Sequence, residues 1–175
     1  PAGKTTPAPS LPLEQGHFFA ASGTCAICHL NMVDEAGIDV SNTTYWRSTM
    51  MANAARDPYW QATVRREVLS SPDYQAAIED KCATCHTPMA RFTEATAGQQ
   101  AQVLVEGFLN PDNELHPLAM DGVSCTVCHQ IRDTGFGEAS FSGGFVIEAD
   151  QPAGERELFG PYPIDKGQAA VMQGG

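Results

Sequence analysis

The chain has 175 residues, of which 10 are basic and 21 are acidic, so its formal net charge is −11. With 42% hydrophobic and 18% charged residues, it is too apolar and too weakly charged for a disordered chain. The acidic balance argues against binding nucleic acid or an anionic membrane through a basic patch. No apolar run approaches the length of a membrane-spanning helix. The chain length suggests one domain, or one compact domain with an appendage.

The N-terminal segment, residues 1–13, contains four prolines and a single charged residue, Lys4. Such a composition predicts an extended tether without a core of its own. Two interpretations stay open for it: a disordered terminus, or a strap that reaches a neighbouring subunit or a surface anchor. A start at Pro1 also fits a secretion signal that has been removed.

Cysteine and histidine occur in one pattern that is repeated three times. The pairs are Cys25 and Cys28, Cys82 and Cys85, and Cys125 and Cys128, and the histidines that follow them are His29, His86 and His129. The C-x-x-C-H pattern indicates covalent attachment of haem c. A short helical turn presents both thiols to the two vinyl groups of a porphyrin and the next imidazole to the iron. Zinc sites or disulfides within the pairs would not require a histidine after each pair. The sequence therefore predicts three covalently attached haem c groups.

Three haems in so short a chain would form most of the core. Each porphyrin buries several hundred Å² of apolar surface, which contributes on the order of 10 kcal/mol at ~25 cal/mol/Å². We therefore expect that the chain does not fold without haem. Thioether attachment is a feature of proteins matured outside the cytoplasm, so we expect a periplasmic, extracellular or outer-surface-attached protein.

Residues 14–130 hold all three motifs and form the predicted three-haem domain. Its predicted helices are short and closely connected. A helix over 45–56 is ended by an Asp-Pro pair, which also begins a second helix over 58–69. A Ser-Pro pair then begins a third helix that leads directly into the second motif. A fourth helix is predicted over 96–108, before an Asn-Pro pair ends it.

The C-terminal region, residues 131–175, differs in composition and contains nine of the 16 glycines. Residues 139–148 predict two short strands around a Gly-Gly turn, and residues 157–162 predict a further edge strand. We expect this region to pack on the haem domain as loops and short strands. The predicted fold is therefore mainly α with much irregular structure, a haem core and a small β-hairpin region near the C-terminus. The last residues carry no capping or packing signal, so we expect the natural chain to continue beyond Gly175.

Three low-spin haems require six axial ligands, whereas the chain has five histidines. The motif histidines provide three proximal ligands, and His17 and His116 are the candidates for two distal positions. The alternative for each is an ordinary surface histidine. The sixth ligand would be a methionine, a group from another chain or water, or it would be absent. Met51 is the preferred methionine, because small alanines three and four residues further along a helix leave room for a porphyrin, and Met50 is the second choice.

Three segments of the chain, TYWRSTMMANAARDPYWQA, EDKCATCHTPMA and LAMDGVSCTVCHQI, resemble a group of secreted bacterial multihaem cytochromes c. The resemblance covers about residues 16–162. This group is distantly similar to the tetrahaem cytochromes of the hydroxylamine pathway, in which a Ser-x-His-Ala helix carries a distal histidine ligand. The matching residues here are Thr49-Met50-Met51-Ala52, so the resemblance places Met51 where that histidine lies. It also implies further haem motifs downstream of the glycine-rich region in relatives.

These features favour electron transfer along closely spaced haems, by a carrier or conduit subunit without catalytic residues. One alternative is a protomer of a larger membrane-bound electron-transfer complex or of a polymeric cytochrome wire. Another is a redox enzyme with one open haem for a small oxyanion, which the net charge of −11 disfavours. The expected partners are redox proteins with a basic docking face. Neither nucleic acid nor a transmembrane span is expected, and an oligomer or larger complex stays open.

Overall fold

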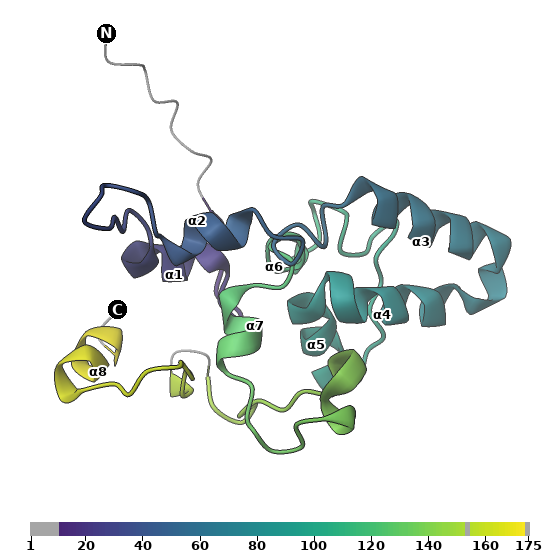
Figure 1. The fold of residues 1–175 in the computed structure, drawn as a ribbon. Helices are drawn as coiled ribbons and strands as arrows, with labels where there is room; N and C mark the ends of the chain where they lie inside the picture. The colour runs from purple at the N-terminus through teal and green to yellow at the C-terminus, as the bar shows by residue number, and fades with distance from the viewer. Residues whose placement is uncertain (1–10, 153–154, 174–175) are drawn as a thin grey trace, which may run out of the picture.

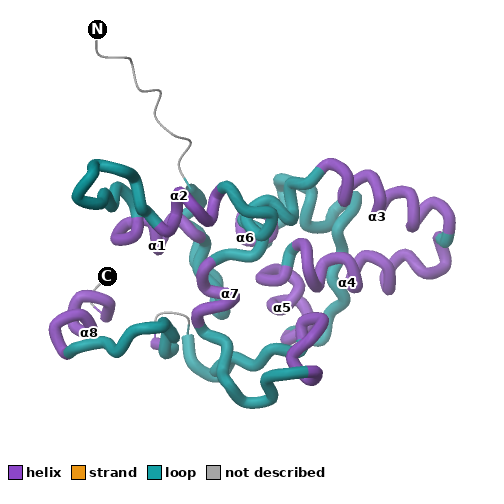
Figure 2. The backbone as a smooth tube through the Cα atoms, viewed as in Figure 1, coloured by secondary structure: helices purple, strands orange, loops and turns teal. Residues whose placement is uncertain are grey.

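The structure is a computed structural model that describes residues 11–152 and 155–173. These residues are mainly helical with much irregular structure (Figure 1), and no strand occurs among them (Figure 2). Two isolated β-bridges join Gln15 to Ala20 and Val33 to Asp39. The helices are α1 (Ser22–His29), α2 (Asn42–Arg47), α3 (Pro58–Ser70), η1 (Pro72–Tyr74), α4 (Gln75–His86), α5 (Pro88–Thr96), α6 (His116–Met120), α7 (Cys125–His129), η2 (Glu138–Gly143) and α8 (Lys166–Gln173). The expectation of a mainly α fold is confirmed.

The antiparallel helices α3 and α4 lie side by side at one end of the molecule (Figure 1). Asp57 begins α3, because its carboxylate accepts a hydrogen bond from the Tyr59 backbone N–H at 2.9 Å. Pro58 takes the first helical position, where no N–H donor is needed. Pro72 begins η1, a short 3-10 helix that leads directly into α4. The second and third predicted helices are therefore confirmed.

Two clusters of buried apolar side chains form the core. The first lies between α3, α4 and the loop before α6 and includes Trp60, Val64, Ala83, Val103 and Phe108. The second joins the N-terminal segment to α5, α6 and α7 and includes Phe18, Phe19, Met89, Leu118, Val127 and, from the C-terminal region, Ile147. Cys82 packs against the first cluster, and Val127 of the third motif belongs to the second. Both clusters therefore support a cysteine motif.

The helix predicted over 45–56 is wrong beyond its first turn. Helix α2 ends at Arg47, and the residues after it form consecutive turns up to α3. The side chain of Asn53 donates hydrogen bonds to the backbone carbonyls of Arg47 and Thr49, at 3.0 and 2.8 Å. Such local bonds compete with the carbonyl partners that a helix would use. The two adjacent methionines of this segment therefore lie in a turn.

The helix predicted over 96–108 is also wrong, because α5 ends at the first of these residues and the others form a loop. The buried carboxylate of Glu79, on α4, accepts hydrogen bonds from the backbone N–H groups of Val103 and Leu104. A helix would use these N–H groups internally. The Glu79 carboxylate, which is distant in sequence, therefore takes the place of the carbonyl acceptors that these N–H groups would have in a helix.

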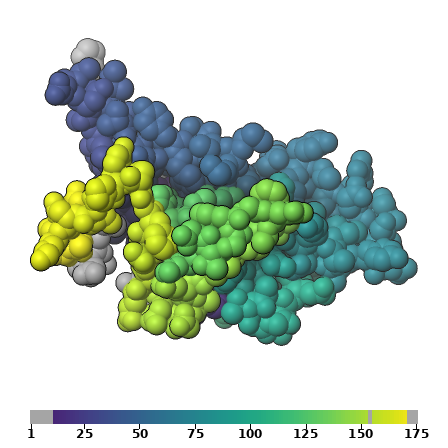
Figure 3. Space-filling view, turned by 60° about the horizontal axis from the view of Figure 1, so that its bottom comes forward, coloured from purple at the N-terminus to yellow at the C-terminus, as the bar shows by residue number. Residues whose placement is uncertain are grey.

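The C-terminal region contains turns and short helices in place of the predicted strands. The β-hairpin predicted over 139–148 is wrong, because its first half belongs to η2, which ends at Gly143 in a left-handed conformation (φ +82°). The edge strand predicted over 157–162 is wrong as well, since these residues are irregular. Figure 3 shows the residues after the third motif spread over one face of the molecule. Phe145 of this region stacks on Phe92 of α5, with ring centroids 5.5 Å apart.

The two ends of the chain complete the fold. The tether predicted over 1–13 lies outside the described residues up to residue 10. The carbonyl of Pro12 accepts a hydrogen bond from the Gly23 backbone N–H at 2.9 Å, which fastens the start of the described chain to α1. Helix α8 was not predicted. None of the helices in the described ranges is long and apolar enough to cross a membrane.

Candidate functional site

Each cysteine motif lies at the C-terminal end of a helix, and α1, α4 and α7 all end at the motif histidine. The first cysteine of each motif is half-buried (Cys25, Cys82, Cys125), the second is exposed (Cys28, Cys85, Cys128), and all six are free thiols. Residues three apart on a helix share one face, so the two thiols of a motif are presented together. Within the described residues, no group of three or more His, Cys, Asp and Glu side chains could bind a metal ion.

Two motif histidines are held by backbone carbonyls. His86 Nδ1 lies 2.8 Å from the carbonyl oxygen of Ala54, and His129 Nδ1 lies 2.7 Å from that of Phe159. A carbonyl oxygen can only accept a hydrogen bond, so Nδ1 donates in both rings and the neutral ring keeps its lone pair on Nε2. This is the arrangement in which a metal-ligating histidine is oriented by its other nitrogen. Both rings are therefore prepared to ligate iron.

The histidine of the first motif is held less firmly. His29 is exposed, and its Nδ1 contacts the side-chain amide of Asn42 at 3.4 Å. This contact is long and joins two exposed side chains, so it fixes neither the ring plane nor the tautomer in the way that a backbone carbonyl does.

The two other histidines also differ from each other. His116 is half-buried on α6, and its Nδ1 lies 2.8 Å from the carbonyl of Phe108, so its ring is held like those of the second and third motifs. His17 is exposed and lies edge-on against Phe18, with ring centroids 4.7 Å apart. The geometry therefore supports His116 as a ligand more strongly than His17.

A hollow of about 630 Å³ lies beside the second motif. Its lining residues are Met50, Met51, Asn53, Ala54, Arg56, Asp57, Pro58, Cys85, His86 and Val123. The turn after α2 thus brings both candidate methionines, whose side chains are 88% and 51% exposed, to the same hollow as Cys85 and His86. Thiol, imidazole and thioether groups around a hollow of this volume fit a covalently attached porphyrin.

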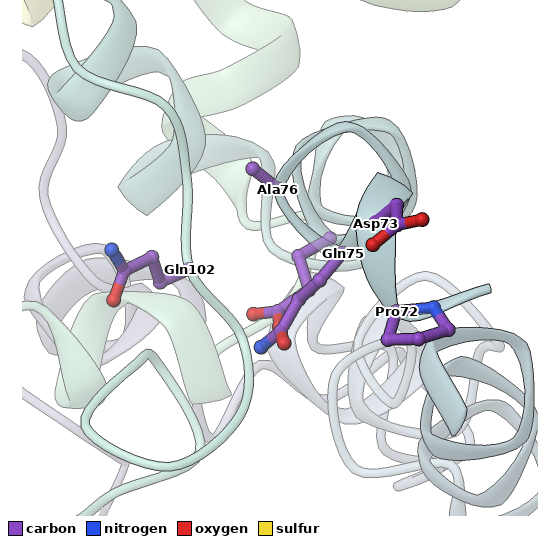
Figure 4. Close-up of a pocket in the computed structure, with 6 residues that line it drawn as sticks. Pro72, Asp73, Gln75, Ala76 and Gln102 are labelled. Atoms are coloured by element: carbon purple, nitrogen blue, oxygen red, sulfur yellow. The ribbon is translucent and has the colours of Figure 1, made fainter.

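A second hollow, of about 370 Å³, lies at the start of α4 (Figure 4). It lies between Pro72, Asp73, Gln75 and Ala76 on one side and Gln102 on the other, with Glu79 in its lining. The carboxylate of Glu79 is already engaged by Gln75 and by the loop after α5. This hollow contains neither cysteine nor histidine and belongs to the attachment of that loop to α4.

The first and third motifs lie next to each other. Helix α1 contacts α7, and the thiols of Cys25 and Cys125 are neighbours. The hydrogen bond between them lowers the pKa of the Cys25 thiol and, together with burial, raises the pKa of Cys125. The buried carboxylate of Asp121 accepts hydrogen bonds from the backbone N–H and the hydroxyl of Ser22, both at 2.7 Å, and joins the start of α1 to the segment before α7. Burial raises the pKa of Asp121.

The family model described as cytochrome c554 and c-prime matches residues 24–130. The chain belongs to this family. No curated protein and no solved structure matches it. The matched residues contain all three cysteine motifs. As a c-type cytochrome of a multihaem family, the chain is an electron-transfer protein that holds haem covalently, which agrees with the presentation of thiols and imidazoles described above.

Residues outside the family match also contribute to the cytochrome's third motif. The carbonyl of Phe159 holds His129, as described above, and the backbone N–H of Phe159 donates to the His129 carbonyl. Arg156 is 6% exposed and donates to the carbonyls of His17 and Glu148, at 2.9 and 2.8 Å. It thereby ties the segment before α1 to the C-terminal region beside this motif.

Sequence reasoning missed these contributions. A backbone carbonyl has no signature in a sequence, so the partners of the motif histidines could not be predicted. Arg156 is one of two arginines in a glycine-rich region, and nothing in its neighbours indicates that it is buried. Among the residues that sequence reasoning missed, Asp121 has the clearest signal in the sequence. It lies four residues before Cys125, in the segment quoted for the family resemblance.

Proposed function

We propose that this cytochrome carries three covalently attached haem c groups and passes electrons along them, as a carrier or conduit subunit. The observation that carries the proposal is the same presentation of two thiols and one imidazole at the ends of α1, α4 and α7. In this proposal His29, His86 and His129 are the proximal ligands. Each haem, when bound, supplies an iron that takes up and releases one electron.

The contacts between the motifs support close spacing of the haems. Cys25 and Cys125 are neighbours, so the first and third attachment sites are adjacent. The backbone N–H of Val123, which lines the hollow of the second motif, donates to the carbonyl of Met51 at 3.0 Å. Gly122 permits this approach, because a Cβ atom there would lie 2.6 Å from the same carbonyl oxygen. We therefore propose that the third haem lies between the first and the second.

The distal ligands are part of the proposal. His116 is the best-supported candidate, since its Nδ1 is held by a backbone carbonyl and its Nε2 is free to bind iron. His17 is the second histidine candidate. Met51, followed by Met50, is the candidate for the haem of the second motif, because both line its hollow. A histidine–methionine haem would have a higher potential than haems with two histidine ligands, which would give the electrons a preferred direction.

We also propose a location and a type of partner. Because thioether attachment takes place outside the cytoplasm, we propose a periplasmic, extracellular or outer-surface position. The net charge of −11 favours a redox partner with a basic docking face. A second candidate function, a protomer of a larger complex or wire, is favoured by exposed apolar side chains beside the first motif, among them Ile27 and Val33.

Mass spectrometry of the denatured holoprotein tests the number of haems directly. We expect three covalent haem additions in the natural sequence and two in the C125A/C128A double variant. Three additions in the double variant would overturn the assignment of the third motif. Fewer than three in the natural sequence would overturn the three-haem proposal. Electron microscopy of the same protein separates single particles from filaments.

A further inference from the structure

Trp60 of α3 contacts the second motif in two ways. Its ring lies parallel to the imidazole of His86, with centroids 4.3 Å apart and an angle of 6° between the planes. The edge of the same ring is held by the contact of His86 Nδ1 with the carbonyl of Ala54. The imidazole is therefore held both in position and in plane by the residues just before and within α3.

The indole N–H of Trp60 has no hydrogen-bond partner among the described residues, although the side chain is buried. A buried donor without a partner is unfavourable and uncommon in native proteins. Cys82 packs against the buried cluster that contains Trp60. Burial raises the pKa of the Cys82 thiol, and the N–H of Trp60 acts in the opposite direction. The one unsatisfied indole of the described chain therefore belongs to the same cluster as a cysteine of the second motif.

The chain contains a second tryptophan that serves as a comparison. Trp46 of α2 is half-buried, and its indole N–H donates to the carbonyl of Val123 at 2.9 Å. This hydrogen bond holds α2 against the segment before α7 and is complete within the chain. The two indoles therefore differ in their hydrogen bonding, since only the N–H of Trp60 has no acceptor among the described residues.

We propose that Trp60 is a positioning residue for the haem of the second motif: its ring sets the plane of His86, and its N–H donates to the sulfur of Cys82 after that sulfur has become a thioether. This inference rests on the proposed attachment of a haem at Cys82 and Cys85. A donor at the edge of the macrocycle stabilises the additional electron of the reduced form, so Trp60 raises the potential of this haem. The hydrogen bonding around the site is one of the means by which a protein adjusts a haem potential.

The test compares the W60F and W46F variants of the holoprotein. Phenylalanine keeps a ring that can stack on His86 but has no N–H. Spectroelectrochemical titration should show one of three potentials lowered in W60F. At a fixed applied potential, the ratio of reduced to oxidised haem should fall about threefold, which corresponds to about 28 mV at 59 mV per tenfold. The lowered potential should be the one that is missing from the C82A/C85A variant. W46F should leave all three potentials unchanged and lower the melting temperature.

A further variant, W60L, separates the ring from the N–H. Without the aromatic ring, the plane of His86 is no longer set, so the electron paramagnetic resonance signal of this haem should broaden or shift in W60L and stay narrow in W60F. Unchanged potentials in W60F, or equal shifts in W60F and W46F, would overturn the role of the N–H. An identical signal in W60L and the natural sequence would overturn the role of the ring. A natural protein without haem at Cys82 and Cys85, counted by mass, would instead overturn the proposed function.

Discussion

The first and second motifs have the same C-x-x-C-H pattern, but their histidines have different surroundings. His86 stacks on Trp60 and is held by the carbonyl of Ala54, next to a buried apolar cluster. His29 is exposed and has a long contact with the side chain of Asn42. The pattern thus specifies how the thiols are presented, whereas the surroundings decide how firmly the chain itself holds the histidine ring.

This difference has consequences for the haems. A ring held by the chain keeps one tautomer and one plane, and hydrogen bonding and burial adjust the potential of its iron. A ring without such support depends on the haem for its orientation. We therefore expect the second motif to be organised largely by the protein and the first to be organised largely by its haem.

Removal of a single haem should separate the two motifs most clearly. We expect the C25A/C28A and C82A/C85A variants each to lose one haem by mass. Hydrogen exchange should then show lost protection around residues 30–40 in the first variant, whereas α3 and α4 should keep most of their protection in the second, because buried side chains of the chain itself join them. Loss of protection across α3 and α4 in the second variant would contradict a second motif that is organised largely by the protein.

The H29A and H86A variants should show the same difference in stability. Both should shift one iron to high spin, visible by electron paramagnetic resonance. H86A also removes a ring that stacks on Trp60 and leaves a cavity, so it should cost roughly 2 kcal/mol more in the free energy of unfolding than H29A. Denaturant titration of both variants measures this difference. Equal losses would show that the packing around His86 contributes nothing to stability.

The third motif differs from the other two because the C-terminal region supports it, and a substitution of Arg156 tests this support. R156M should cost about 1.5–3 kcal/mol, because it removes hydrogen bonds from a buried charged group to several backbone carbonyls. R66M, at an exposed position on α3, should cost less than about 0.5 kcal/mol. Thermal or denaturant unfolding distinguishes the two variants. A neutral R156M would contradict the role of the C-terminal region as a support for this motif.

Substitution of Met51 tests which side chain is the distal ligand of the haem of the second motif. The oxidised natural protein should show the weak red charge-transfer band of a ferric histidine–methionine haem, and M51H should abolish the band and lower one potential. M50L is the matched control and should keep the band. A band that survives M51H but disappears in M50L would assign the ligand to Met50. A band that is absent from the natural protein would exclude both methionines.

The dependence of the electron-transfer rate on salt concentration should be the smallest of these effects. It distinguishes a carrier from a protomer of a larger complex. With a basic redox partner, the second-order rate should fall as ionic strength rises, because the net charge of −11 steers association and salt screens it. Stopped-flow measurements at several salt concentrations check this. A rate that does not change with salt would favour a permanent docking surface, such as a protomer of a larger complex would have.

Local sequence determined the parts of this protein whose interactions are local. The C-x-x-C-H spacing places two thiols on one helical face wherever the helix lies, so this presentation of the thiols could be predicted from the sequence. Asp57 and Pro58 likewise begin α3 by contacts within one turn. The mainly helical fold and the membership of a multihaem cytochrome family were accessible for the same reason.

Tertiary structure decided the segments in which distant side chains compete with local preferences. Glu79 takes the N–H groups that a helix over 96–108 would need, and the segment predicted as strands packs through Phe145 and Ile147 instead of pairing. The partners of the histidines were decided in the same way: carbonyls of Ala54, Phe108 and Phe159 hold His86, His116 and His129. Every residue has a carbonyl, so only the path of the folded chain determines which one reaches an imidazole.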